Sequence, residues 1–227
     1  MKGGIAINNC WVACCDLLGF SDQVERYTAA NLDIFVNHFY EPVRTEAQAL
    51  AERHPDCVFV TSGSDSFCFY TRDDSVQTFI FLHGEVADFC RFLTGMWPFR
   101  AAIGFGPLYA DASKNIFLGS GMIDAHRYTE GERKPNWIGL TVTQSASKRL
   151  SGLGVDLSRW RVAFSRYAVP TSGHNGTDKV SDGELFAARI HHQAPYIKRA
   201  VEVMQREAPD RYKEKAENTL KFFQSCP

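Results

Sequence analysis

The segment that most constrains the fold is CVFVTSGSDSFCFYT, residues 57–71. It contains two runs rich in aromatic and β-branched residues, separated by the turn-forming sequence from Ser62 to Asp65. Two such runs on either side of a turn containing Gly and Asp predict a β-hairpin. The hairpin places one carboxylate, that of Asp65, at the tip of a rigid element.

Strand-like and helix-like stretches alternate along the rest of the chain. Short apolar runs bounded by Gly or charged residues predict strands at 10–16, 99–110, 137–142 and 161–169. Helical spacing of apolar residues predicts helices at 21–53 (kinked or divided at Pro42), 75–95, 120–130 and 143–152. Residues 170–184 are the most loop-like, and a helical, charged part is expected from about residue 183. The order predicts an α+β or α/β sandwich with one mixed sheet covered by helices, in a single domain over 1–227.

Composition excludes several functional classes. The 227 residues are 44% hydrophobic and 22% charged with a net charge of −1, typical of an ordinary globular domain without a field that attracts nucleic acid or anionic membranes. The N-terminal residues contain no seven-residue apolar core before Asn8 and Asn9, and no apolar run reaches roughly 18 residues, so we expect neither secretion nor a membrane span. None of the seven cysteines forms a C-x-x-C pair. We therefore expect reduced, mostly buried cysteines in a cytoplasmic protein that binds neither nucleic acid nor membrane.

Two acidic residues stand out because each ends a rigid element. Asp16 ends the first predicted strand and is followed by a turn at Gly19, and Asp65 lies in the hairpin turn. If that strand neighbours the hairpin, the carboxylates converge, and a cation is needed to keep both ionised. Oxygen ligands of this kind suit Mg²⁺ or Mn²⁺. The alternative is that Asp16 caps a helix and Asp65 serves only the turn.

Four segments, in order over residues 10–150, resemble the class III nucleotidyl cyclases. CDLLGFSDQV resembles their D-I-x-G-F-S opening strand, and SGSDSF resembles their metal-binding hairpin, with Ser64 in place of a Gly. FRAAIGFGPL resembles their R-x-G-I-x-x-G strand, and FLGSGMIDAHRYTE resembles the later stretch ending in an N-x-x-x-R pair. The resemblance implies an α+β, ferredoxin-like cyclase fold: a mixed, mostly antiparallel sheet flanked by helices.

The resemblance also implies roles for individual residues. Asp16 and Asp65 would be catalytic ligands of two divalent cations, Mg²⁺ or Mn²⁺, with the backbone from Asp16 to Phe20 around the triphosphate. Arg100 would bind phosphate, and Arg127 would stabilise charge on the α-phosphate as the ribose 3′-hydroxyl attacks and pyrophosphate leaves. The alternative for Arg127 is an ordinary surface arginine on a helix.

Three positions depart from the pattern of purine cyclases. The base-reading lysine and acid of those enzymes correspond to Thr61 and Ile116, and the asparagine before the arginine corresponds to Ile123. Small cyclases that lack the purine-reading pair are similar to the pyrimidine cyclases of the bacterial anti-phage system Pycsar. These make cyclic UMP or cyclic CMP, which activates a separate effector. The resemblance implies a uridylate or cytidylate cyclase, with UTP favoured and Thr61 beside the base. A class III adenylate or guanylate cyclase and a non-catalytic nucleotide-binding or dimerisation module remain alternatives.

The resemblance further implies a homodimer with two composite sites. In this fold the metal-binding aspartates of one subunit face the arginine of the other, so Asp16, Asp65 and Arg100 would meet the Arg127 of a second copy. All of these residues are present in the one chain.

Overall fold

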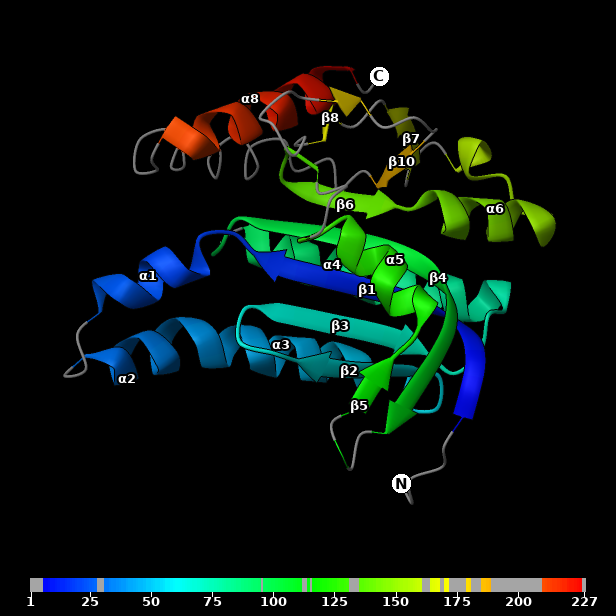
Figure 1. The fold of residues 1–227 in the computed structure, drawn as a ribbon, viewed down its shortest axis with the longest axis horizontal. Coiled ribbons are helices and arrows are strands. Elements are labelled where there is room, and N and C mark those ends of the chain that lie inside the picture. The colour runs from blue at the N-terminus through cyan, green and yellow to red at the C-terminus, as the bar shows by residue number, and fades with distance from the viewer. Residues whose placement is uncertain are drawn as a thin grey trace.

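The computed structural model describes residues 6–27, 31–94, 96–111, 114, 116–130, 135–160, 164–167, 170–171, 179–180, 185–188 and 210–225. An eight-stranded mixed sheet runs through them in the order β2-β3-β1-β4-β6-β10-β7, with β5 paired to β4 (Figure 1). Its neighbours are antiparallel except β4 and β6, which are parallel. The strands are β1 (Ala6–Leu17), β2 (Val58–Ser62), β3 (Ser66–Thr71), β4 (Phe99–Asp111), β5 (Ile116–Leu118), β6 (Gly139–Val142), β7 (Phe164–Tyr167) and β10 (Leu185–Ala188). A separate antiparallel pair joins β8 (Pro170–Thr171) to β9 (Lys179–Val180).

Helices cover the sheet unequally. In the view of Figure 1, α3 and α4 lie behind the sheet and α5 lies in front. The helical elements are α1 (Phe20–Arg26), α2 (Leu32–Phe35), the π-helical η1 (Val36–Tyr40), α3 (Glu41–Ala51), α4 (Val76–Thr94), α5 (Ser120–Arg127), α6 (Gln144–Gly152), the 3₁₀ helix η2 (Leu157–Arg159) and α8 (Asp210–Ser225). The α+β fold with a mixed, mostly antiparallel sheet flanked by helices is therefore confirmed.

The side chains of β1 point alternately to the two faces of the sheet, so they contribute to two separate cores. Trp11, Ala13 and Cys15 join the larger core under α3 and α4. Cys10, Val12, Cys14, Cys68, Leu108 and Ala125 form the smaller one under α5. The six cysteines within the described ranges are free, as expected.

Helix α5 approaches β4 closely because glycines face each other there. A Cβ atom at Gly104 would lie 2.7 Å from the backbone nitrogen of Ala125, and one at Gly121 would lie 2.9 Å from the carbonyl oxygen of Gly106. These contacts leave no room for a side chain, so the glycines set the position of α5 on the sheet.

The structure corrects three details of the expected elements. The helical part expected from about residue 183 is wrong for residues 185–188, which form β10, because the apolar run LFAA pairs with β6 and β7 inside the sheet. The expected helix over 21–53 is divided into α1, α2, η1 and α3, with Pro42 in the first turn of α3. The expected loop at 170–184 contains β8 and β9.

Parts of these expectations lie outside the described residues: 161–163 and 168–169 of the expected strand, 172–178 and 181–184 of the loop, and 189–209 of the helical part. The single domain over 1–227 stays a prediction. Within the described part of the chain, we find no helix with the length and apolar character needed to cross a membrane.

Candidate active site

The two predicted aspartates meet where β1 ends beside the hairpin. Asp16 lies opposite Ser66 of β3 and opposite Arg100 of β4. The backbone N–H of Leu17 donates a 2.9 Å hydrogen bond to the carbonyl oxygen of Asp65, in the turn between β2 and β3. The prediction that the first strand neighbours the hairpin is confirmed, and Asp16 and Asp65 lie at the same end of the sheet.

A tight turn leads the chain from β1 into α1. Gly19 has φ 75° and ψ 20°, the left-handed region that favours glycine. The turn is fixed because Leu18 donates its N–H to the carbonyl of Pro98 (2.9 Å) and accepts from the indole Nε1 of Trp97 (3.0 Å). This geometry places Phe20, the first residue of α1, beside the two aspartates.

Arg100 and Asp16 form a buried ion pair. The guanidinium Nη2 of Arg100 donates to Oδ2 of Asp16 at 2.7 Å, and the residues are 7% and 6% exposed. Burial raises the pKa of Asp16; Arg100 opposes the rise, while Glu130 and Asp65 add to it. A second cation near Asp16 would offset this cost of burying the charge. The buried Nε of Arg100 has no hydrogen-bond partner in the described structure, so this arginine retains a donor.

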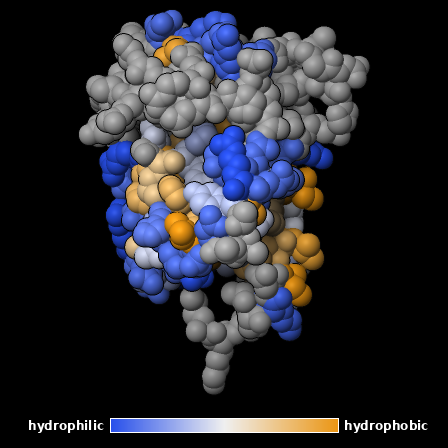
Figure 2. Space-filling view, turned by 90° about the vertical axis from the view of Figure 1, so that its left-hand side faces the viewer, coloured by the Kyte–Doolittle hydropathy of each residue, from blue (hydrophilic) through white to orange (hydrophobic). Residues whose placement is uncertain are grey.

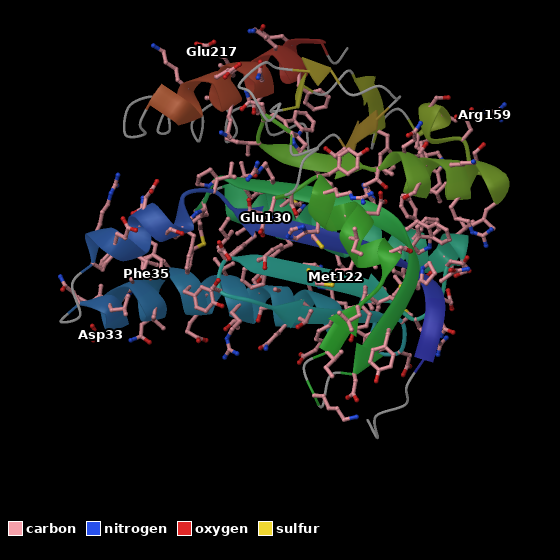
Figure 3. The ribbon with its side chains drawn as sticks, viewed as in Figure 1. Asp33, Phe35, Met122, Glu130, Arg159 and Glu217 are labelled. Carbon is pink, nitrogen blue, oxygen red and sulfur yellow. The ribbon has the colours of Figure 1, made fainter. Side chains whose placement is uncertain are left out.

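These residues line a pocket of about 500 Å³, a size that suits a small-molecule ligand. Asp16, Asp65, Phe20 and Arg100 are brought together in it, as the sequence predicts. The remaining lining residues are Leu17, Leu18, Gly19, Ser21, Asp22, Glu130 and Lys215. Glu130 follows α5 and is labelled in Figure 3. The pocket thus combines four carboxylates with an arginine and a lysine.

Lys215 reaches the pocket because α8 is anchored one turn further along. The side-chain amide of Asn218 donates to the carbonyl of Asn136 (2.9 Å), and the hydroxyl of Thr219 accepts from the N–H of Ile138 (2.9 Å). Residues three and four apart share a helix face, so these contacts turn the face carrying Lys215 toward the sheet. Sequence reasoning missed Lys215 and Glu130 because no local pattern connects either of them with Asp16.

Two predicted site residues lie elsewhere. Thr61 is on β2 opposite Cys68, and it does not line the pocket. Arg127 ends α5 and is exposed, and its side chain makes no hydrogen bond or ion pair with any other described residue. In one copy of the chain, Arg127 is therefore separate from the two aspartates.

Asp124 holds α5, the helix that ends at Arg127. Its Oδ2 accepts hydrogen bonds from the hydroxyls of Thr143 (2.6 Å) and Ser145, and from the backbone N–H of Phe105 (3.4 Å). These donors come from β4 and from the start of α6. Arg127 is therefore presented to the surface from a helix with a fixed position.

The donor set fits a divalent cation in part. Asp16 and Asp65 supply hard carboxylate oxygens at one place, and Mg²⁺ is commonly held by one or two carboxylates together with water and substrate phosphates. Within the described ranges, no group of three or more His, Cys, Asp or Glu side chains is placed to hold a metal by itself. A cation here would depend on the ligand for the rest of its coordination.

Comparison with known proteins supports the fold. No protein-family model matches the sequence, and no curated protein matches it significantly. One solved structure of a bacterial light-regulated adenylyl cyclase superposes with a TM-score of 0.58 at 12% identity, over 90% of this chain and 58% of that one. Another, of the same description, gives a TM-score of 0.53 at 11% identity, over 87% of this chain and 98% of that one. This chain spans 58% of the length of the first structure. It has the fold of the bacterial adenylyl cyclases.

Proposed function

We propose that this chain is a metal-dependent nucleotide cyclase that converts a pyrimidine nucleoside triphosphate, preferably UTP, into the 3′,5′-cyclic monophosphate and pyrophosphate. The observation that carries the proposal is the convergence of Asp16, Asp65 and Arg100 in one pocket. The activity named for the similar structures, adenylyl cyclase, supports cyclase chemistry in this fold.

The pocket residues that the sequence predicts have the following tasks in this reaction. Asp16 and Asp65 would hold two divalent cations, which lower the pKa of the ribose 3′-hydroxyl and neutralise the phosphates. The turn from Leu17 to Phe20 would wrap the triphosphate. Arg100 would direct its free Nε–H to a phosphate oxygen while it keeps its ion pair with Asp16.

The choice of a pyrimidine rests on the residues at the purine-reading positions, which do not line the pocket of their own chain and would face the base only in the site of a partner. Thr61 and Ile116 replace the lysine and acid that read adenine or guanine in the resembling enzymes. Without these side chains, the polar edge of a purine would lack hydrogen-bond partners, and the preference of the site for a purine would fall by a large factor. The cyclic nucleotide would act as a second messenger in the cytoplasm, sensed by a separate effector during anti-phage defence.

Two copies of the chain are needed for a complete site. The exposed Arg127 would enter the pocket of a partner and stabilise charge on the α-phosphate. On α5 and the adjoining β5, Ile123 is 54% exposed and Leu118 is 66% exposed, which offers apolar surface for a second copy. A two-fold homodimer would contain two equivalent composite sites.

The direct test incubates the protein with each of ATP, GTP, CTP and UTP in the presence of Mn²⁺ and separates the products by chromatography. Cyclic UMP or cyclic CMP supports the proposal. Asp16→Ala and Asp65→Ala should each abolish the product, whereas Asp33→Ala, on the exposed side of α2, should leave it unchanged. Cyclic AMP or cyclic GMP would instead identify a purine cyclase, and no product would favour a non-catalytic module.

The composite site is tested by mixing inactive variants. Asp16→Ala and Arg127→Ala are each expected to be inactive alone. Mixed in equal amounts, half of the dimers combine the two variants, and one site of each such dimer has intact aspartates and an intact arginine. Activity should therefore recover to about a quarter of the wild-type value if subunits exchange freely. No recovery after co-expression of the two chains would contradict a shared site.

A further inference from the structure

A π-helical segment lies directly beside the proposed metal-binding hairpin. Residues Val36–Tyr40 form η1, between α2 and α3. π-helical turns are rare and occur frequently at functional sites. The last residue of this segment is Tyr40, which is half-buried.

The hydroxyl of Tyr40 reaches the hairpin turn. It donates a 2.7 Å hydrogen bond to the carbonyl oxygen of Gly63. The N–H of Gly63 in turn donates to the carbonyl of Ser66 at 2.8 Å, which closes the turn that carries Asp65. Within the turn, the hydroxyl of Ser64 donates to Oδ1 of Asp65 at 2.9 Å. Tyr40 thus holds the turn from outside, at the peptide group just before Ser64.

The ring of Tyr40 connects both chain segments that carry the aspartates. Its centroid lies 5.9 Å from that of Phe20, at the start of α1, and 6.4 Å from that of Phe67, on β3. Phe20 follows the turn after Asp16, and Phe67 follows Asp65 by two residues. These aromatic contacts position the hydroxyl of Tyr40, and its hydrogen bond to Gly63 fixes the hairpin turn.

We propose that Tyr40 is a positioning residue whose hydroxyl holds the hairpin turn so that the Asp65 carboxylate faces Asp16. This inference rests on the proposed function, because the task of the two aspartates is to share cations. Tyr40 contacts neither the substrate nor the metal in this proposal. It acts through the backbone of Gly63.

The test uses Tyr40→Phe, which removes the hydroxyl and keeps the ring. Amide hydrogen exchange of the peptide containing residues 62–67 should be faster than in the wild type. Mn²⁺ binding without nucleotide, followed by electron paramagnetic resonance, should weaken by about three- to tenfold, the range expected for one lost hydrogen bond. In the activity assay, the Mn²⁺ concentration for half-maximal rate should rise by a similar factor, and kcat should recover at saturating Mn²⁺.

Tyr27→Phe is the matched control. The ring of Tyr27 packs against Phe35 with a centroid distance of 5.2 Å, in the same aromatic group, and its hydroxyl makes no hydrogen bond within the described structure. This variant should leave hydrogen exchange at 62–67 and Mn²⁺ affinity unchanged.

The outcomes separate this inference from the proposed function. If the wild-type protein binds Mn²⁺ through the aspartates and Tyr40→Phe binds it equally well, the role of Tyr40 is overturned and the cyclase proposal stands. If the wild-type protein neither binds Mn²⁺ nor forms a cyclic nucleotide, both are overturned. If it forms a cyclic nucleotide without binding Mn²⁺ alone, the Mn²⁺ concentration for half-maximal rate decides the role of Tyr40. A kcat that stays low at saturating Mn²⁺ would show general damage to the fold, and would also contradict the positioning role.

Discussion

The two faces of the central sheet are built in different ways. The face under α3 and α4 contains a continuous core with the large aromatic side chains Phe67, Phe69, Phe79 and Phe89. The opposite face is covered by α5, eight residues long, over a small core of cysteine and short aliphatic side chains. Figure 2 views the end of the molecule that carries α1 and α2, where the described surface is mainly hydrophilic and hydrophobic side chains form separate patches. The comparison indicates that stability comes mainly from the first face; the second is the face on which we propose that a partner binds.

The two faces should differ most in the loss of stability that follows when a large buried side chain is removed. Phe89 is fully buried and packs on Phe67 and Phe69 with centroid distances of 5.3 and 5.4 Å. Phe89→Ala should reduce the free energy of unfolding by about 3–5 kcal/mol, measured by urea denaturation. Met122→Ala, at the edge of the small core, should cost clearly less. Equal losses would show that the faces contribute alike.

Replacing Gly with Ala should change the free energy of unfolding in opposite directions on the two faces. Gly104→Ala should destabilise the fold by about 1–3 kcal/mol and increase hydrogen exchange in α5, because the new Cβ would collide with the backbone of Ala125. Gly84→Ala, on the exposed side of α4, has no atom within 4 Å of the new Cβ and should stabilise the helix by up to about 1 kcal/mol. Both variants are compared by thermal and urea unfolding. A stable Gly104→Ala protein would mean that α5 can shift freely.

The large-core face also contains a buried acid, Glu85 of α4, which is 6% exposed. Burial raises its pKa above the ordinary value of 4.5, against the opposing effect of Arg53 and His54. A raised pKa means that the folded state binds the proton more tightly, so its contribution to stability falls as the pH rises from 4.5 through the folded-state pKa. Glu85→Gln should reduce the dependence of the free energy of unfolding on pH above pH 4.5, by less than about 1 kcal/mol. Urea unfolding between pH 4 and pH 8 compares the two proteins, and identical slopes would exclude the effect.

The smallest change in stability is expected on the exposed side of α5. Ile123→Ser should alter the free energy of unfolding by no more than about 0.5 kcal/mol, because the side chain is already 54% exposed. If this side contacts a second copy, the same variant should lower the mass measured by sedimentation velocity from dimer to monomer. Ile34→Ser, on α2 and 48% exposed, is the matched control and should change neither quantity.

Local patterns predicted much of the fold. The hairpin, α4 and the end of β1 follow from turn residues and from the spacing of apolar residues, so Asp16 and Asp65 could be placed before the structure. The apolar run of β10 is too short to show a strand period, and only its pairing with β6 and β7 identifies it. The ion pair between Arg100 and Asp16 depends on the register of β1 and β4. Lys215 depends on the docking of a helix distant in sequence, which no local pattern encodes.

Helix α8 completes a pocket whose other walls are encoded much earlier in the chain. The strands β1, β3 and β4, which bring Asp16, Asp65 and Arg100 together, all precede residue 112. Lys215 lines the same pocket from a helix far along the chain, and pairings between distant segments form slowly because closing a long loop is entropically costly. An incompletely folded chain would therefore contain Asp16 and Asp65 at the end of the sheet but would lack Lys215 beside them. If the pocket binds a nucleotide, as we propose, binding should appear only after α8 has docked, so the order of folding would keep incompletely folded chains inactive.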